Sequence, residues 1–185
     1  EGAIAKSCDV YFYQLGLRIG LDAILSDGVL MGFRDKSGID LENEIAPIYP
    51  SNAAYFDRKY GSRGWSKWGA TLNFAIGQGE NTQNVIDMTR FYAALASGGE
   101  SSTPYVVRRR SDQVRSLGLT PTQLEGLRTA PIAVVETGTA AASRSRDLQI
   151  AGKTGTAQNS HGEDHGWFVG FAPADKPQII VGSIM

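Results

Sequence analysis

The chain has 185 residues, a formal net charge of −1, 42% hydrophobic residues and 20% charged residues. This composition is typical of one globular domain with enough apolar side chains for a core, and the near-neutral charge gives no electrostatic basis for binding nucleic acid. No apolar run approaches the roughly 18–20 residues of a membrane span. The one basic run, Arg108-Arg109-Arg110, is shorter than most charged interaction tails and is expected to be a solvated surface patch.

Two helices are predicted near the start of the chain. Residues 10–18 (VYFYQLGLR) are apolar at helical intervals, with Asp9 as the expected N-cap, and Gly20 would end this helix. Residues 21–33 follow with a second helical pattern. Residues 34–70 are rich in Gly, Pro, Asn and Ser and predict a long loop region, which in a compact domain tends to be functional.

Two more helices are predicted in the middle of the chain. The first covers residues 83–97 and would be capped by Asn81 or Thr82. The second covers residues 121–136 and opens on a Thr-Pro pair, which suits the start of a helix. Pro131 lies inside this second segment and predicts either a kink or a later start.

The last part of the chain changes character. Residues 148–158, 165–173 and 178–185 are short, rich in β-forming residues and separated by turn residues. Short connections between such strands favour an antiparallel meander. The sequence therefore predicts an α+β chain, with helices and loops in residues 1–147 and three antiparallel strands in residues 148–185.

The stretch AGKTGTAQ, residues 151–158, places a cation beside two hydroxyls and a glycine. Side chains alternate along a strand, so Lys153 and Gly155 share one face, where the glycine leaves room for a ligand or a backbone. Thr154 and Thr156 point to the other face and would serve the same ligand only where the strand twists or borders a cleft. Taken alone, the stretch also fits an edge strand that carries a solvated lysine.

A second short motif lies far upstream of the first. Ser7-Cys8-Asp9 fits a Ser-x-Asn/Asp pattern directly before a predicted helix, although alone it also fits a simple capping sequence. Ser-x-x-Lys, a Ser-x-Asn motif and Lys-Thr-Gly together form the motif set of β-lactamases and penicillin-binding proteins. The order of the two motifs in this chain agrees with that set.

Five segments carry a family resemblance, in order along the chain: SCDVYFYQLGLRIGLD, IGQGE, GTAAA, AGKTGTAQ and GWFVGFAP. With them, the chain resembles the transpeptidase domain of class B penicillin-binding proteins of the cell-elongation type. The resemblance implies a β-lactamase/transpeptidase-like fold, in which a helical lobe packs on an antiparallel sheet. Residues 1–185 would then be a partial transpeptidase domain that is truncated at both ends.

The resemblance also implies an activity and roles for individual residues. The activity is serine acyl transfer on peptidoglycan stem peptides that end in D-Ala-D-Ala, with covalent inhibition by β-lactams. Ser7 would relay a proton between two lysines, Asp9 would take the Asn place of its motif, and Lys153 would attract the substrate carboxylate and tune Ser7. Thr154 and Thr156 would hydrogen-bond that carboxylate, and the backbone N–H of Thr156 would contribute to the oxyanion hole.

Two further residues belong to the predicted substrate and β-lactam site or its neighbourhood. Gly155 leaves the gap beside the lysine. Gln78, in the Gly-Gln-Gly turn of IGQGE, would lie near the cleft without an assigned chemical role. Cys8 is the only cysteine, and it is expected either to be a small buried hydrophobe or to be a zinc ligand with partners supplied from upstream. No other cofactor is predicted.

The Ser-x-x-Lys motif of the nucleophile does not occur, because none of the six lysines follows a serine by three positions. We expect that motif and the first strands of the sheet before Glu1, and a covering helix after Met185. The chain alone is then predicted to be inactive, with WFVGF and IIVG as bare apolar surface. The expected partners are the stem peptide, β-lactams and the missing segments of a membrane-anchored protein on the periplasmic face of the inner membrane.

Three other interpretations remain open at this stage. A non-catalytic β-lactam sensor or pseudoenzyme would have a substituted nucleophile in the upstream sequence. A β-lactamase would hydrolyse its acyl-enzyme rapidly, but the Ser7-Cys8-Asp9 motif and residues 34–70 favour a transpeptidase. If the motif matches were coincidental, a plain α+β binding module would remain.

Overall fold

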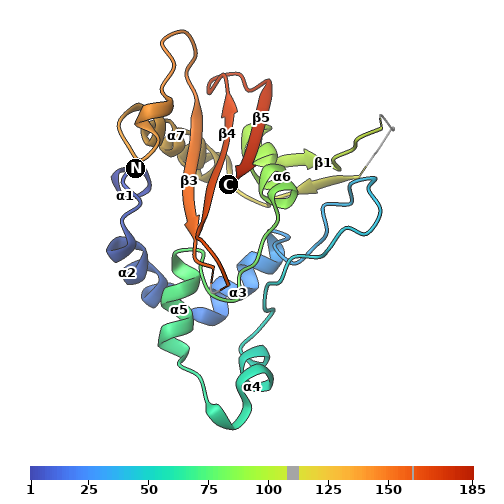
Figure 1. The fold of residues 1–185 in the computed structure, drawn as a ribbon. Coiled ribbons are helices and arrows are strands. Elements are labelled where there is room, and N and C mark those ends of the chain that lie inside the picture. The colour runs from blue at the N-terminus through green and yellow to red at the C-terminus, as the bar shows by residue number, and fades with distance from the viewer. Residues whose placement is uncertain (108–112, 160) are drawn as a thin grey trace. The chain divides into compact units, whose positions relative to one another are not determined.

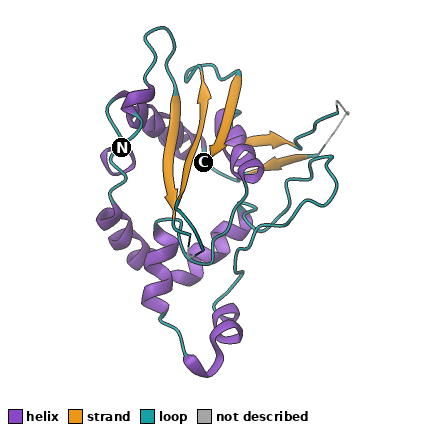
Figure 2. Ribbon diagram, viewed as in Figure 1, coloured by secondary structure: helices purple, strands orange, loops and turns teal. Residues whose placement is uncertain are grey.

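In the computed structural model, residues 1–107, 113–159 and 161–185 are described, and the chain divides into two compact units. Each unit is built from separate stretches of sequence. The sheet unit comprises Glu1–Ser7, Ser37–Glu44 and Asn84–Met185, and the helical unit comprises Cys8–Lys36 and Ile45–Gln83. The basic run 108–110, predicted to be a surface patch, lies outside the described residues. Figure 2 shows the helices in purple and the strands in orange, and along the chain most of the helices precede the strands.

The helical unit contains four α-helices and one 3₁₀ turn: α2 (Asp9–Ile19), α3 (Leu21–Leu30), α4 (Ala54–Tyr60), η1 (Gly61–Arg63) and α5 (Lys67–Ala75). The two helices predicted near the start of the chain are present. The long loop predicted for residues 34–70 is wrong in its second half, which holds α4, η1 and the start of α5. Ser66 begins α5 by accepting a hydrogen bond from Gly69 N at 3.0 Å.

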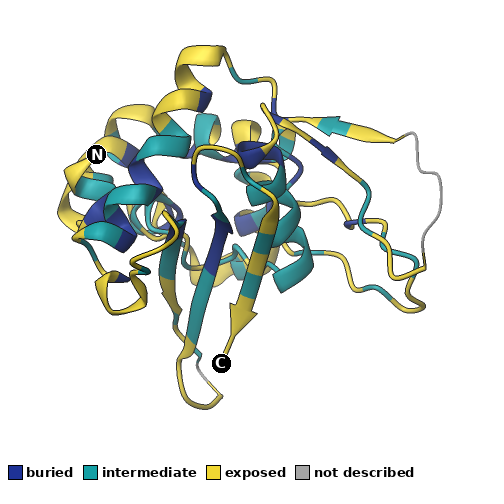
Figure 3. Ribbon diagram, turned by 90° about the horizontal axis from the view of Figure 1, so that it is seen from above, coloured by how far each residue is buried: buried dark blue, intermediate teal, exposed yellow. Residues whose placement is uncertain are grey.

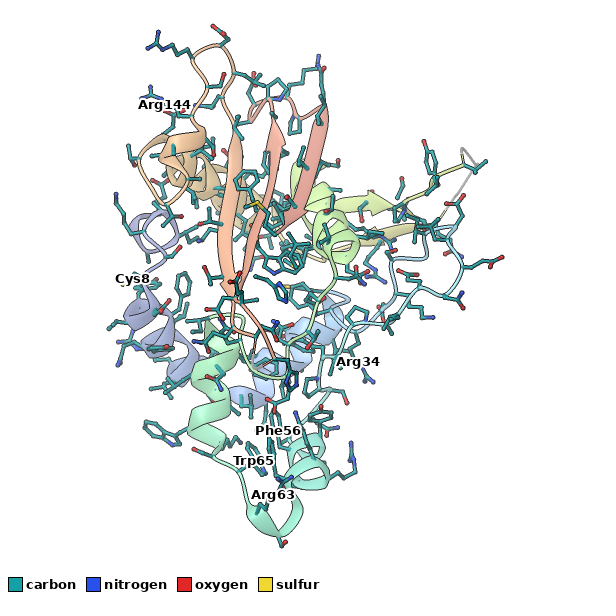
Figure 4. All side chains as sticks on the ribbon, viewed as in Figure 1. Cys8, Arg34, Phe56, Arg63, Trp65 and Arg144 are labelled. Atoms are coloured by element: carbon teal, nitrogen blue, oxygen red, sulfur yellow. The ribbon has the colours of Figure 1, made fainter. Side chains whose placement is uncertain are left out.

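Aromatic packing explains why a helix forms in that second half. Phe56 is 1% exposed and stacks on Trp65 with ring centroids 4.7 Å apart, and the two labelled side chains lie together in Figure 4. Phe56 also meets Phe74 of α5 edge to face. The Trp65 indole N–H donates to the Asp57 carboxylate at 2.8 Å. This packing stabilises a seven-residue helix that its composition did not reveal.

Tyr49 lies in the core of the helical unit, beside Leu21, Leu25 and Phe74. Its hydroxyl donates to the Ile24 carbonyl of α3 at 2.8 Å. Burial, with a smaller contribution from the carboxylate of Asp27, raises the pKa of Tyr49 to about 12.

The elements of the sheet unit are α1 (Gly2–Ala5), α6 (Val85–Ala96), β1 (Glu100–Ser102), β2 (Val114–Ser116), α7 (Pro121–Glu136), η2 (Ala141–Ser143), β3 (Ala151–Ala157), β4 (His165–Ala172) and β5 (Ile179–Ile184). Helix α6 starts later than predicted, because Asn84 rather than Asn81 or Thr82 is its N-cap. The Asn84 side chain accepts a hydrogen bond from Asp87 N at 2.9 Å.

Helix α7 spans residues 121–136, as the sequence predicted. Thr120 and Gln123 form a reciprocal capping box at its start, which fixes the first turn. Pro131 is buried inside the helix, so the later start that it also allowed does not occur. Among the residues that the structure describes, no helix is long and apolar enough to cross a membrane.

Strands β3, β4 and β5 lie side by side in an antiparallel sheet, which confirms the predicted meander (Figure 1). Their register pairs Lys153 with Val169 and Phe171 with Ile180. Helix α7 packs against β3, and α6 packs against β4 and β5.

Strands β4 and β5 differ in how far they are covered. Val169 and Phe171 are 4% and 2% exposed, and Phe171 packs with residues of α6, so the expectation that WFVGF would be bare is wrong (Figure 3). Ile179 and Val181 alternate with the paired, inward residue Ile180 and remain 65% and 51% exposed. The prediction of bare apolar surface therefore applies to β5 alone.

Candidate active site

Ser7 lies in the tight connection that follows α1. Its backbone has a φ of +49°, in the left-handed region that residues other than glycine seldom adopt. The Ser7 N–H donates to the Ile4 carbonyl at 3.2 Å, which closes the turn. Such a conformation persists only where the surrounding structure holds it, and it clusters at functional sites. The side chain of Ser7 is half-buried.

Lys153 reaches Ser7 from the middle of β3. Its Nζ donates to Ser7 Oγ and also to the carbonyl oxygen of Thr154 at 2.9 Å. The two residues are 146 positions apart in the sequence, so only the fold of the sheet unit brings them together. The proximity that the shared motif set predicted is confirmed.

The amine of Lys153 and the hydroxyl of Ser7 form a donor–acceptor pair through which a proton can pass. A serine hydroxyl can both donate and accept, and an amine that has lost its proton can take one back. When it is protonated, the Lys153 amine is a cation with threonine hydroxyls near it on β3. Such a group can bind an anion, for example a carboxylate. The geometry thus fits proton transfer combined with carboxylate recognition.

The hydroxyls of Lys-Thr-Gly-Thr differ in their surroundings. Thr154 Oγ1 lies 2.6 Å from Thr139 Oγ1, whereas Thr156 is exposed. Gly155 is exposed as well, and a Cβ there would meet only Trp167, at 3.4 Å. The room beside the lysine that the glycine was predicted to leave is therefore present.

Thr139 was not singled out by the sequence, although it belongs to the quoted GTAAA segment, residues 138–142. Its partner Thr154 is 15 positions away on another element. No local spacing rule connects a residue after a helix with a residue in a strand, so the contact had no sequence signal of its own.

Asp9, Gln78 and Cys8 belong to the helical unit. Asp9 is the first residue of α2 rather than its N-cap, and no side chain caps that helix, so the predicted capping role is wrong. Gln78 is half-buried and donates its N–H to the Asn73 carbonyl at 2.8 Å, just after α5. The roles proposed for Asp9 and Gln78 beside the Lys-Thr-Gly strand remain predictions.

Cys8 is a free, exposed thiol, so the expectation of a buried hydrophobe is wrong. Within residues 1–107, 113–159 and 161–185, no three His, Cys, Asp or Glu side chains are grouped so that they could hold a metal ion. Structural zinc has four ligands and catalytic zinc usually has three from protein. Zinc binding through Cys8 therefore stays a prediction that depends on ligands from other segments.

A second polar cluster in the sheet unit was not anticipated. Glu44 accepts hydrogen bonds from the backbone N–H and the hydroxyl of Ser37, at 2.7 and 2.6 Å, and Arg90 donates to the Ser37 carbonyl at 2.8 Å. Burial raises the pKa of the nearby Asp87 to about 6, and the charge of Glu44 adds to the effect, partly offset by Asn84, Arg115 and Arg90. This cluster joins the segment 37–44 to α6.

Comparison with known proteins places the chain in a family. The family model "Penicillin binding protein transpeptidase domain" matches residues 1–185. The peptidoglycan D,D-transpeptidase MrdA of Acinetobacter baumannii is 35% identical over 208 residues, covering 98% of this chain and 30% of that protein. The peptidoglycan D,D-transpeptidase PbpA of Mycobacterium tuberculosis is 26% identical and covers 99% of this chain and 38% of that protein.

Solved structures agree with these relatives. Penicillin-binding protein 2 of Helicobacter pylori, in its complex with MreC, matches with a TM-score of 0.86 and 30% identity, over 99% of this chain and 35% of that one. Penicillin-binding protein 2 of Pseudomonas aeruginosa, in complex with WCK 5153, matches with a TM-score of 0.83 and 31% identity, over 99% and 43%. The chain spans less than half the length of these relatives. It belongs to the penicillin-binding protein transpeptidase domain family, as a class B member similar to MrdA and PbpA.

Proposed function

We propose that this chain is part of a peptidoglycan D,D-transpeptidase, which cross-links stem peptides by serine acyl transfer and is acylated by β-lactams. The observation that carries the proposal is the hydrogen bond from Lys153 Nζ to Ser7 Oγ, beside the Lys-Thr-Gly strand of a chain that belongs to this family. A binding module without chemistry would have no need to hold an amine against a serine in a left-handed turn.

The reaction assigns a part to each residue of the site. A nucleophilic serine attacks the carbonyl of the penultimate D-Ala, the terminal D-Ala leaves with a proton, and an amine of a second stem peptide then takes the acyl group. Ser7 and Lys153 relay the proton to the leaving amine. Thr154 and Thr156 bind the terminal carboxylate, and the N–H of Thr156 faces the developing oxyanion. Asp9 would take the Asn place of the Ser-x-Asn motif.

The nucleophile itself would come from outside these 185 residues. None of the six lysines follows a serine by three positions, and the chain covers only 30% and 38% of the two curated relatives. A Ser-x-x-Lys helix places its lysine about one helical turn from the serine that it activates. Ser7 has no such neighbour, which leaves it the role of passing a proton.

The relatives also suggest partners and a location. Penicillin-binding protein 2 of Helicobacter pylori forms a complex with MreC, and that of Pseudomonas aeruginosa a complex with WCK 5153. By likeness, we expect the full-length protein to bind peptidoglycan stem peptides, β-lactams and a protein of the cell-wall machinery. Such a protein acts on the periplasmic face of the inner membrane, to which it would be anchored.

Acylation and turnover of the full-length protein test this function together. It should bind a fluorescent penicillin covalently, at a serine that mass spectrometry maps to a Ser-x-x-Lys motif. It should also release D-Ala from a pentapeptide donor when an acceptor amine is present. Acylation without D-Ala release would point to a β-lactam sensor, rapid loss of the label to a β-lactamase, and no labelling at all would reject the proposal.

A further inference from the structure

Thr139 lies at a junction between the two halves of the proposed proton relay. Its backbone N–H donates to the carbonyl oxygen of Ala5 at 3.2 Å, two residues before Ser7. Its hydroxyl lies 2.6 Å from the hydroxyl of Thr154, the residue that follows Lys153. One residue therefore contacts both α1 and β3, each within two positions of a member of the relay.

Two neighbouring contacts hold the same junction. Lys6 Nζ donates to the Thr137 carbonyl, at the C-terminal end of α7, at 2.6 Å. A Cβ on Gly138 would overlap the carbonyl oxygen of Ala5 and lie 2.7 Å from Val134 Cα, so no larger residue fits there without movement. The segment that follows α7 therefore packs closely against α1, which precedes Ser7 in the sequence.

We propose that Thr139 is a positioning residue, which sets the place of Ser7 relative to Lys153 and the direction of the Thr154 hydroxyl. This deepens the proposed function and rests on it. The Ser7 backbone is in a left-handed conformation that its own sequence does not favour, so an external hold is needed to keep its Oγ against Lys153. Displacement of a reacting group by ~1 Å is enough to cost up to about a hundredfold in rate.

The contact between the two threonines has a second consequence. A hydroxyl has one proton to donate and two lone pairs to accept. When Thr139 donates to Thr154, the Thr154 proton is left free for the substrate carboxylate. Without the Thr139 hydroxyl, Thr154 loses the partner that orients it. Loss of the Thr139 hydroxyl should therefore lower both the affinity for the substrate carboxylate and the rate of acylation.

Thr139→Val and Thr139→Ser in the full-length protein separate positioning from general stability. Valine keeps the shape of threonine and removes the hydroxyl, whereas serine keeps the hydroxyl. Thr129→Val is the matched control, because the Thr129 hydroxyl bonds within its own helix, to the Glu125 carbonyl at 2.9 Å. The measured quantities are the rate of acylation by a fluorescent penicillin between pH 5 and 9, the melting temperature, and hydrogen exchange at the Thr139 amide.

Thr139→Val should acylate about tenfold more slowly with a changed pH profile, while Thr139→Ser stays within about twofold of the wild type. Thr129→Val should keep the wild-type rate and pH profile. In Thr139→Val the backbone amide of residue 139, which donates to the Ala5 carbonyl, should exchange its hydrogen several-fold faster than in the wild type. A Thr139→Val protein with the wild-type amide exchange would overturn the proposal, as would one with the wild-type rate and pH profile, or an equal loss of rate in Thr139→Ser.

The proposed function and this inference fail separately. If the wild-type protein is not acylated at all, the transpeptidase assignment is rejected. The amide exchange of Thr139 then still decides whether its hydroxyl holds α1 against β3, since that measurement needs no activity. Unchanged exchange in Thr139→Val rejects the positioning role whether or not the wild type is labelled.

Discussion

Lys153 Nζ donates a hydrogen bond to Ser7 Oγ across 146 positions of sequence. The lysine comes from the middle of an antiparallel strand and the serine from a left-handed turn after a four-residue helix. The two residues belong to separate local structures, and no local sequence pattern links them. Their meeting is therefore the feature of the sheet unit that most directly supports a chemical role, and the first prediction tests it.

Lys153→Ala and Ser7→Ala should each slow penicillin acylation of the full-length protein by roughly 10²–10⁴-fold, the range that loss of a proton-transfer group typically costs. The double variant should lose little more than either single one, because residues that act as a unit are not additive. Lys176→Ala, which removes an exposed lysine between β4 and β5, is the control. Independent, additive losses would show that the two residues do not share one function.

The 185-residue chain alone should not be labelled covalently by a fluorescent penicillin, whereas the full-length protein should be. Acylation needs a serine with a lysine one helical turn away, and no serine in this chain has that neighbour. The labelling must use material that circular dichroism shows to be folded, since the exposed side chains of β5 favour association. Stoichiometric labelling of the folded chain at any of its serines would contradict the prediction.

Asp87 should make the sheet unit less stable as the pH rises from about 4 to about 6. Its pKa is about 6 in the folded chain instead of the usual 3.8, so the folded state holds the proton more tightly than the unfolded state does. The stability from the protonated form is complete below the lower value and is lost as the pH passes the higher one. The shift corresponds to ~3 kcal/mol, which partial exposure reduces to about 1 kcal/mol.

Asp87→Asn should remove that pH dependence and raise the free energy of unfolding at pH 7 by about 1 kcal/mol. Denaturant unfolding at pH 4, 5, 6 and 7 measures both effects. Asp175→Asn, which changes an exposed carboxylate in the connection between β4 and β5, is the control. A parallel pH dependence in wild type and Asp87→Asn would show that another group is responsible.

Cys8→Ser should lower the zinc content of the purified full-length protein. The thiol is exposed and precedes α2 directly, so it is available to a metal that other segments also bind. Elemental analysis of the wild-type and variant proteins, after removal of loosely bound metal, measures the difference. An equal zinc content in both would end the idea that Cys8 is a ligand.

Gly28→Ala and Gly126→Ala should change stability in opposite directions, although both replace a helical glycine. A Cβ on Gly28 of α3 would overlap the hydroxyl end of the buried Tyr49, so this change should cost about 1–3 kcal/mol. A Cβ on Gly126 of α7 meets nothing within 4 Å and should stabilise the helix by about 0.5–1 kcal/mol. Thermal unfolding of both variants measures the difference, and a common sign would contradict the packing around Tyr49.

Local patterns in the sequence were enough to predict several elements. The three strands of the sheet that contains Lys153, and their antiparallel order, follow from β-rich runs with short turns between them. Helix α7 follows from Thr120 and Pro121, because capping chemistry is local. The family resemblance followed from ordered short motifs. That resemblance also predicts that Ser7 and Lys153 form a pair.

Other features depend on contacts between residues that are distant in the sequence, and no local pattern contains them. Helix α4 exists because Phe56 packs on Trp65 and Phe74, although its segment has the composition of a loop. Thr139 is part of the candidate site because it bonds to residues of α1 and β3. Cys8 is exposed, although a lone cysteine is expected to be buried. The sequence by itself determined which side chains are candidates for the chemistry, and the periodicity of the elements that hold them. Only the tertiary structure decided which of them meet, because burial and hydrogen bonding across elements depend on how the whole unit packs.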